Sequence, residues 1–565
     1  MSEDADQGRS PYTGQPVGEA VPHTTEAELD ALRFAGPLPL AGRAELLEAV
    51  AAALEDARDE LVPLADAETG LGETRLGGEL TRTRAQLEMF AEVVREGSFL
   101  EVIVDHADPA TPVAPRPDLR RMLIPVGPVA VYAASNFPFA FSVAGGDTAS
   151  ALAAGCPVVV KAHPGHPGLS RRTGQIVGDA LTRAGAPAGT FTVVHGMDAG
   201  LHLVRHPAIR AAGFTGSLQG GRALYDLANA RPDPIPFYGE LGSLNPVVVT
   251  PGALASRGSE IVTGFVGSFT LGAGQFCTKP GLLFLPRGHG RDAELAAAAG
   301  AVSVGPLLND RIQRGFEQVA SKLAATDGVR LISGRAFSGP LPAEAGQVPP
   351  RTPAAETGPP SSQPLTADAS QPSAQSADAG QPSARSADAG QPSAQSADAG
   401  QASPQPLTAG AGSGSPLLLA VAAGDLSPDL LEECFGPASL VVEYGSAGEL
   451  ARALDLVPGA LTATVHADPD TEQELIRELL ARFADRAGRV IFGGWPTGVA
   501  VTRAQQHGGP WPATTNALHT SVGATGIRRW LRPVAYQDVP DAYLPEPLQD
   551  ANPLGIPRRT SRPRM

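Results

Sequence analysis

Apolar residues in the first part of the chain follow a helical spacing. Within residues 44–68 they recur at i, i+3 and i+4, which predicts an amphipathic helix. After this part, short apolar runs such as CPVVVKA and TFTVVHG alternate with helical patterns, including those at 171–184 and 221–229. Buried strands that alternate with helices predict a parallel β-sheet covered by helices.

The same alternation returns in the second half of the chain. A helical pattern at 259–271 is followed by the apolar runs LLLAVAA, SLVVEYG, ALTATVHA and RVIFGG. We therefore expect an α/β protein with two lobes, each built on a doubly wound sheet.

Residues 335–415 interrupt the second lobe. They consist mainly of Pro, Ala, Ser, Gln and Gly and contain almost no large apolar residue. A decapeptide of the type QPSAQSADAG recurs three times within them, over residues 371–400. Because each repeat has only alanine to bury, burial cannot offset the entropy of ordering, and we predict a disordered low-complexity insertion. It is either a tolerated expansion of a surface loop or a tether that binds a partner.

Composition and charge narrow the class of protein. The 565 residues are 42% hydrophobic and 18% charged, as in proteins with sizeable cores, and the net charge is −16. Such a surface repels phosphate backbones, so we expect no nucleic-acid partner. The acidic start lacks an apolar signal region and no apolar run is long enough to span a membrane. With three cysteines and no CxxC, a reducing, cytoplasmic location is expected.

Three residues are candidates for covalent chemistry. Cys277 lies in GQFCTKPG at a helix-to-turn junction, where its thiol and backbone N–H can both be accessible, although a lone cysteine is often a small buried hydrophobe. Glu240 in FYGELG follows a strand, and partial burial there would raise its pKa and suit a general base; the alternative is a solvated surface carboxylate. Asn136 in ASNFPF could donate to an oxyanion or simply shape a turn.

Other residues suggest a nucleotide. Lys161 ends the strand VVVK, and the carboxyl ends of parallel strands form the crevice where nucleotides bind. The segment FTGSLQGG follows another strand and opens a helix, where small residues let a pyrophosphate approach; this loop is not GxGxxG and is weak alone. Its candidate residues are Thr215, Gly216, Ser217 and Gly221. His163 and His166 lack a second ligand pair, so no metal site is expected.

The order of these blocks resembles the aldehyde dehydrogenase superfamily: Asn136, Lys161, FTGS, Glu240, Cys277 and then EECFGP at 432–437. The segments GQFCTKPG, GWPTGV and HGGPWPATT are similar to its α-ketoglutarate semialdehyde (2,5-dioxopentanoate) dehydrogenase branch. The resemblance implies oxidation of that small aldehyde to 2-oxoglutarate. It covers almost the whole chain apart from the insertion and the extreme termini.

The resemblance also implies roles for residues. Cys277 would attack the aldehyde to give a thiohemiacetal and then a thioester. Asn136 and the Cys277 N–H would hold the oxyanion. Glu240 would activate the thiol or the water that hydrolyses the thioester. Glu433 and Phe435 would hold the nicotinamide ribose and ring.

The remaining cofactor contacts implied by the resemblance are those of the adenosine half and the pyrophosphate. Lys161 would bind the adenosine ribose and Ser217 the pyrophosphate. The cofactor is NADP or NAD, with NADP slightly favoured, because Pro164 stands where NAD-preferring relatives commonly have an acid. Arg171, Arg172 and Arg210 are candidates to assist a 2′-phosphate.

The family fold implies a Rossmann-like cofactor domain, an α/β catalytic domain and a small oligomerisation element, and hence a homodimer or homotetramer. The expected segments are cofactor domain 1–106 and 126–240, oligomerisation element 107–125 and 515–565, catalytic domain 241–334 and 416–514, and insertion 335–415. Two alternatives stay open. One is an NADP-dependent fatty or broad-range aldehyde dehydrogenase, which would lack a carboxylate-binding cation in its substrate tunnel; the other is a non-catalytic binding protein on the same fold.

Overall fold

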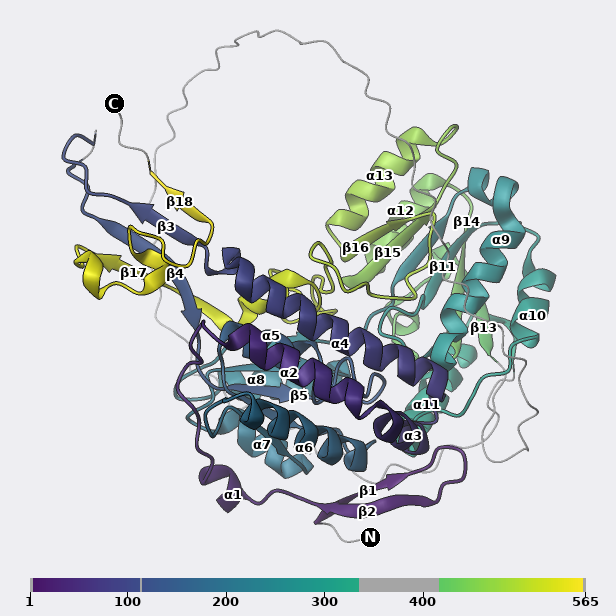
Figure 1. The fold of residues 1–565 in the computed structure, drawn as a ribbon. Coiled ribbons are helices and arrows are strands. Elements are labelled where there is room, and N and C mark those ends of the chain that lie inside the picture. The colour runs from purple at the N-terminus through teal and green to yellow at the C-terminus, as the bar shows by residue number, and fades with distance from the viewer. Residues whose placement is uncertain (1–3, 112–113, 335–415, 562–565) are drawn as a thin grey trace, which may run out of the picture. The chain divides into compact units, whose positions relative to one another are not determined.

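The computed structural model describes residues 4–111, 114–334 and 416–561. The predicted insertion at 335–415 lies outside the described residues. Figure 1 shows the elements, which form four sheets with helices around the two largest of them.

The first large sheet has five strands in the order β7-β6-β5-β8-β9, all parallel to their neighbours. The strands are β5 (Val129–Tyr132), β6 (Val158–Lys161), β7 (Phe191–Val194), β8 (Ala211–Thr215) and β9 (Phe237–Glu240). One core joins this sheet to α2 (Arg43–Asp56), α3 (Arg58–Thr69), α4 (Glu73–Glu96), α5 (Gly146–Ala154) and α6 (Pro167–Arg183). A second core joins it to α1 (Glu26–Asp30), α7 (Met197–Arg205) and α8 (Leu218–Asn229). The predicted doubly wound lobe therefore has a helical layer on each face.

The amphipathic pattern at 44–68 forms two helices, and the expectation of one helix was wrong. Ala57, with φ −95° and ψ 10°, separates α2 from α3, and the Arg58 side chain binds back to Glu55 and to the Gly77 carbonyl. Apolar spacing reports which face of a segment is buried, but it does not report whether its backbone hydrogen bonds continue.

The second large sheet has seven strands in the order β12-β13-β14-β11-β10-β15-β16, of which only β12 runs antiparallel to its neighbour. The strands are β10 (Pro246–Val249), β11 (Leu282–Pro286), β12 (Arg330–Ser333), β13 (Leu417–Ala422), β14 (Ala438–Tyr444), β15 (Ala460–His466) and β16 (Ala487–Phe492). One core holds α9 (Pro251–Thr270) and α10 (Asp292–Gly300), and another holds α11 (Asp310–Ala325), α12 (Ala447–Leu456) and α13 (Gln473–Ala484).

Two smaller sheets complete the described part. The first has the order β17-β4-β3-β18 and joins distant segments: β3 (Val102–Asp105), β4 (Leu119–Pro125), β17 (Leu531–Gln537) and β18 (Arg558–Thr560). The expected oligomerisation segments thus contribute strands to one sheet, which also includes residues just ahead of 107. The second is a hairpin of β1 (Ala5–Arg9) and β2 (Pro16–Pro22).

The chain after β16 returns to the first sheet, and this crossing positions the site. Thr514 forms a bridge with Glu240 at the end of β9, and Leu241 N–H donates to the Ala513 carbonyl at 2.8 Å. Residues 507–521 are thereby held beside the end of β9.

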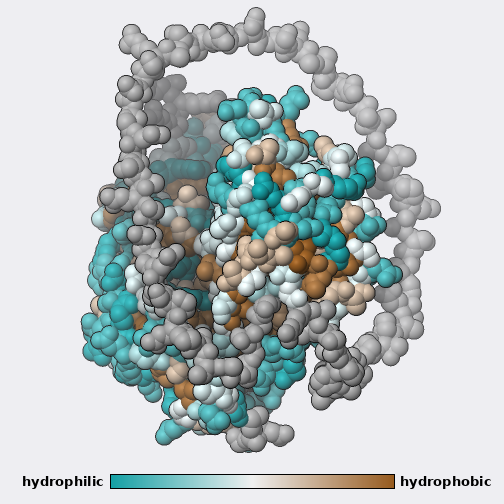
Figure 2. All heavy atoms as spheres, turned by 90° about the vertical axis from the view of Figure 1, so that its right-hand side faces the viewer, coloured by the Kyte–Doolittle hydropathy of each residue, from teal (hydrophilic) through white to brown (hydrophobic). Residues whose placement is uncertain are grey.

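None of the helices in the described ranges has the length and apolar character needed to cross a lipid bilayer. On the face shown in Figure 2, hydrophilic side chains surround separate hydrophobic patches.

Candidate active site

Cys277 lies at the end of a tight loop that only small residues can form. Gly272, Ala273 and Gly274 have φ of 57°, 56° and 69°, in the left-handed region that favours glycine. A Cβ on Gly274 would lie 2.1 Å from the Gly436 carbonyl oxygen. The Cys277 loop and the EECFGP loop can therefore approach each other only with glycine at 274.

Two buried polar side chains hold this loop in place. Asn245 Nδ2 donates to the carbonyl oxygens of Cys277 at 2.8 Å and Lys279 at 2.9 Å. The Lys279 ammonium in turn donates to the carbonyl oxygens of Cys434 at 2.7 Å and Ala438 at 2.8 Å. Asn245 and Lys279 are positioning residues, and the sequence analysis did not single out either of them as part of the site.

Asn136 is tied to the same loop. Its Nδ2 donates to the Gln275 backbone carbonyl at 2.9 Å, and the backbone carbonyl of Asn136 accepts from Arg75 Nη2 at 2.6 Å. Since an amide nitrogen carries two hydrogens, one remains for another acceptor. The structure thus links Asn136 to the loop that carries Cys277.

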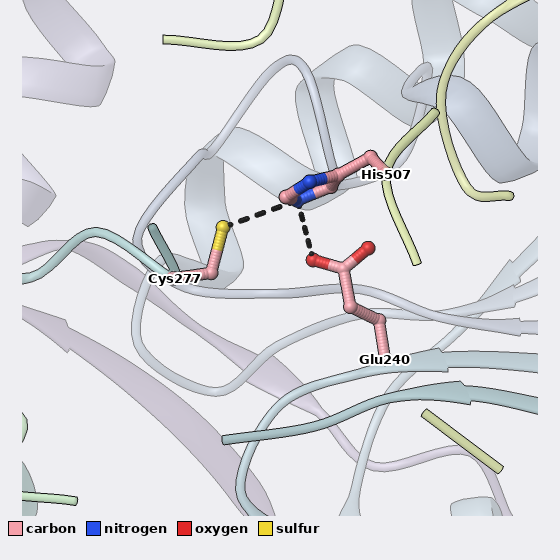
Figure 3. A group of neighbouring side chains, drawn as sticks. All are labelled: Glu240, Cys277 and His507. Atoms are coloured by element: carbon pink, nitrogen blue, oxygen red, sulfur yellow. Dashed lines mark hydrogen bonds and ion pairs between the residues drawn. The ribbon is translucent and has the colours of Figure 1, made fainter. Parts of the chain in front are cut away.

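Cys277, His507 and Glu240 form a compact group (Figure 3). His507 Nε2 lies 3.3 Å from the Cys277 sulfur and 2.9 Å from Glu240 Oε1. The 2.9 Å contact lacks the alignment of a hydrogen bond and becomes an ion pair only when the imidazole carries a proton on both nitrogens, whereas Ser521 Oγ donates a hydrogen bond to Glu240 Oε2. His507 is fully buried and Glu240 is 4% exposed, so bulk water does not screen this pair.

The ionisation of Glu240 differs from the expectation. Burial by itself raises the pKa of Glu240, but His507 and the hydrogen bond from Ser521 outweigh burial and hold the pKa below its usual value. The expected raised pKa was wrong, because the sequence pattern indicated burial without revealing the histidine. Glu240 is therefore ionised at neutral pH.

The pKa of Cys277 shifts in the opposite direction from that of Glu240. Burial, followed by the charges of Glu240 and Glu433, raises the pKa of the Cys277 thiol well above its usual value. The resting sulfur is therefore a thiol, and it needs a proton acceptor to become a nucleophile. The adjacent imidazole and carboxylate offer one.

The carboxyl edge of the first sheet carries the expected nucleotide residues. Lys161 ends β6; among the described residues the only hydrogen bond of its ammonium is to Met197 Sδ, at 3.7 Å, and the charge of Asp6 also acts on it. Burial lowers the pKa of Lys161 to about 8. A buried, largely uncommitted ammonium at this edge fits an oxygen-rich ligand such as ribose.

The loop from Thr215 to Gly221 lies at the end of β8 and opens α8. Ser217 caps α8 by accepting from Gly220 N–H at 3.2 Å, and a Cβ on Gly221 would lie 2.1 Å from Leu241 Cδ2. Gly216 N–H donates to the Glu240 carbonyl, and Thr215 is half-buried. The helix N-terminus is thereby packed against the catalytic strand, in a geometry that fits a pyrophosphate.

Glu433 approaches Cys277 from the second lobe. Its carboxylate lies against Gly242, where a Cβ would be 2.3 Å from Oε2, and burial raises its pKa although Lys279 and the Ser243 N–H oppose that shift. Phe435, two residues further on, is half-buried.

His507 is the main residue that the sequence analysis missed. The motif HGGPWPATT contained it, but only as part of a family resemblance. A histidine directly before two glycines was the available signal, and no local pattern connects it with a cysteine 230 positions earlier.

Comparisons with known proteins show the family and the fold of the chain. Residues 10–316 match the family described as "Aldehyde dehydrogenase family". The chain is 43% identical over 554 residues to "Alpha-ketoglutaric semialdehyde dehydrogenase 2" of Azospirillum brasilense, covering 97% of this chain and 92% of the relative. It is 38% identical over 519 residues to "Alpha-ketoglutaric semialdehyde dehydrogenase" of Acinetobacter baylyi, covering 91% and 86%. The fold is similar to that of aldehyde dehydrogenase from Bacillus cereus, solved as an NAD⁺ complex, with a TM-score of 0.67, 18% identity and coverage of 94% and 93%.

Proposed function

The chain belongs to the aldehyde dehydrogenase family, and on that premise we propose that it oxidises 2,5-dioxopentanoate to 2-oxoglutarate with NAD(P) as hydride acceptor. One observation carries the chemistry: the half-buried Cys277 thiol lies 3.3 Å from an imidazole that lies 2.9 Å from an ionised carboxylate. The substrate is supported by two relatives named for it, which match nearly the full chain.

The first step is formation of the sulfur nucleophile. The Cys277 proton moves to His507 Nε2, and Glu240 stabilises the resulting imidazolium at 2.9 Å. The thiolate then adds to the aldehyde carbon, and the oxygen that becomes negative accepts from the Cys277 N–H and the second amide hydrogen of Asn136. Each such donor typically contributes about 3 kcal/mol to the transition state.

The cofactor, when bound, supplies the hydride acceptor. Lys161 would bind its adenosine ribose, the α8 N-terminus its pyrophosphate, and Glu433 and Phe435 its nicotinamide ribose and ring. Each of these positions lies on an element that ends near the carboxyl edge of the first sheet or in the loop packed against Cys277.

Thioester hydrolysis uses the same acid–base pair. Glu240, directly or through His507, takes a proton from the attacking water, and the acyl carbon leaves as a carboxylic acid while the Cys277 sulfur regains its proton.

NADP is proposed to serve at least as well as NAD. Pro164 offers no carboxylate at the position next to Lys161, although the charge of Asp6 acts on Lys161 and His195, as do the charges of Arg311 and Arg171 respectively. Arg172 is instead bound to Glu60, at 2.5 and 2.9 Å. A clearly higher kcat/KM with NAD⁺ than with NADP⁺ would refute this preference.

We also propose a cytoplasmic homodimer or homotetramer, with the domain boundaries expected from the sequence. The support for assembly is the sheet β17-β4-β3-β18, whose end strands each pair on one side only within the described residues. Light scattering on the purified protein tests the mass of the assembly.

The deciding experiment measures NADPH and NADH formation with 2,5-dioxopentanoate, with hexanal in parallel and Cys277→Ala as the control variant. We expect rapid turnover of the dioxo acid, slower turnover of hexanal and none with the variant. A preference for hexanal would leave the cysteine chemistry intact and refute the substrate. No turnover of either aldehyde with either cofactor would favour a binding protein on this fold.

A further inference from the structure

Two arginines reach the neighbourhood of the Cys277 thiol from different lobes. Arg82 is on α4, and Arg489 is on β16. The charge of each interacts with the Cys277 sulfur, and that of Arg82 also interacts with Glu240. Neither arginine has a part in the chemistry proposed above.

One loop anchors both side chains. Arg82 Nε donates to the Val499 carbonyl at 3.3 Å, and Arg489 Nη1 donates to the Gly498 carbonyl at 2.7 Å. Because these carbonyls belong to consecutive residues, the two guanidinium groups are held close to the same short stretch of backbone.

The remaining guanidinium nitrogens are uncommitted. Nη1 and Nη2 of Arg82, and Nε and Nη2 of Arg489, are buried and have no hydrogen-bond partner among the described residues. Leaving charged donors buried without partners is costly. Each set is a pair of neighbouring N–H groups on one planar guanidinium, which is the geometry that binds a carboxylate through both oxygens.

Neighbouring arginines on α4 are used differently. Arg75 donates to the Asn136 carbonyl and lies over the rings of Phe137 and Phe276, at 5.2 and 4.9 Å. Arg84 forms ion pairs of 3.4 Å with Glu55 and with Glu88. Arg82 differs from both in having two terminal nitrogens buried without a hydrogen-bond partner, where Arg75 leaves only Nη1 in that state.

The nearest acid on the helix does not satisfy Arg82. Glu79 interacts with it through charge but forms no hydrogen bond with it: Glu79 Oε1 accepts from the backbone N–H groups of Phe139 and Ala140, at 2.9 and 3.0 Å, and Oε2 has no hydrogen-bond partner among the described residues. Arg82 instead lies over the Phe141 ring at 5.1 Å, and that ring is 6.3 Å from the His507 ring. The Phe141 ring thus lies close to both the Arg82 guanidinium and the His507 imidazole.

We propose that Arg82 and Arg489 form a clamp that binds the carboxylate of the substrate while its aldehyde end meets Cys277. The inference rests on the proposed function and names the cations that make it selective. A fatty aldehyde has no anionic end, so it would leave these buried donors unpaired, and sites of this kind strongly reject substrates that lack the matching group.

The test compares kcat/KM for 2,5-dioxopentanoate with kcat/KM for pentanal, an uncharged aldehyde of the same chain length. In Arg82→Met and in Arg489→Met we expect the ratio to fall on the order of 100-fold, chiefly through a higher KM for the dioxo acid. Arg82→Lys, which retains the charge without the paired donors, should give an intermediate ratio. Arg84→Met, on the same helix, is the matched control and should leave the ratio unchanged.

Two failures are distinguishable. If the wild-type enzyme shows no preference for the dioxo acid, the proposed function fails and the clamp fails with it. If the wild type prefers the dioxo acid but both methionine variants keep that preference, the clamp alone is wrong. Equal losses with both aldehydes would also overturn it, because a parallel loss indicates a structural role.

Discussion

Replacing His507 with asparagine removes the nitrogen that lies between Cys277 and Glu240 but keeps a polar side chain. The expected loss follows from the thiol. Burial and the neighbouring carboxylates raise the pKa of Cys277 well above its usual value, so near neutral pH almost all of the sulfur is thiol without a base. Losing the base should therefore lower kcat/KM by on the order of 100-fold, within the usual range for general-base catalysis.

The pH dependence gives the sign of the effect. A thiol with a raised pKa gains thiolate as pH rises, so the rate of the variant should increase about tenfold per pH unit until the thiol pKa is reached. The wild-type rate should depend less on pH, because the proton passes within the buried group. The deficit of His507→Asn should thus be largest near neutral pH and shrink in alkali.

Alkylation by iodoacetamide measures the sulfur alone, without hydride transfer or hydrolysis. Cys156 and Cys434 are 0% and 5% exposed, so fast labelling reports Cys277, and Cys277→Ala provides the background rate. His519→Asn is the matched control, because its ring packs edge-on against Tyr238, at 5.1 Å, and not on the cysteine. Alkylation of His507→Asn at the wild-type rate and with the wild-type pH profile would refute the reasoning.

Three further predictions concern the surroundings of the site. Gly242→Ala places a Cβ 2.3 Å from Glu433 Oε2 and should raise KM for NAD(P) several-fold, whereas Gly267→Ala meets nothing within 4 Å and should not. Asn245→Ala leaves the Cys277 and Lys279 carbonyls without their donor. The thermal midpoint and the alkylation rate of Cys277 should therefore both fall. An unchanged alkylation rate would contradict the positioning role of Asn245. Burial raises the pKa of Glu68 to about 7, although the hydrogen bonds that its carboxylate accepts from the Leu169 and Gly168 N–H groups act to lower that pKa. Its stabilising contribution is complete below the unfolded pKa of about 4.5 and is lost as pH rises through about 7. The thermal midpoint of Glu68→Gln should therefore rise relative to wild type from about pH 5 to about pH 8, and a constant difference would refute this.

The sequence was informative wherever function depends on the end of a local element. Lys161 and Glu240 each end a strand, and apolar runs mark such ends because burial of both sheet faces demands continuous apolar residues. The order of these residues along the chain, together with Cys277, was enough to indicate the family. The α/β class and the alternation of strands and helices followed from the same local patterns.

Tertiary structure alone decided which distant side chains surround the nucleophile. His507 reaches Cys277 across 230 positions because the chain returns from β16 to pair with β9, and no local pattern encodes that crossing. The same packing decided the sign of the Glu240 pKa shift, since burial and an imidazole act in opposite directions. Arg82 and Arg489 look like ordinary surface arginines in the sequence. Their free donors are a property of the packed site, because hydrogen-bond satisfaction depends on every neighbouring segment at once.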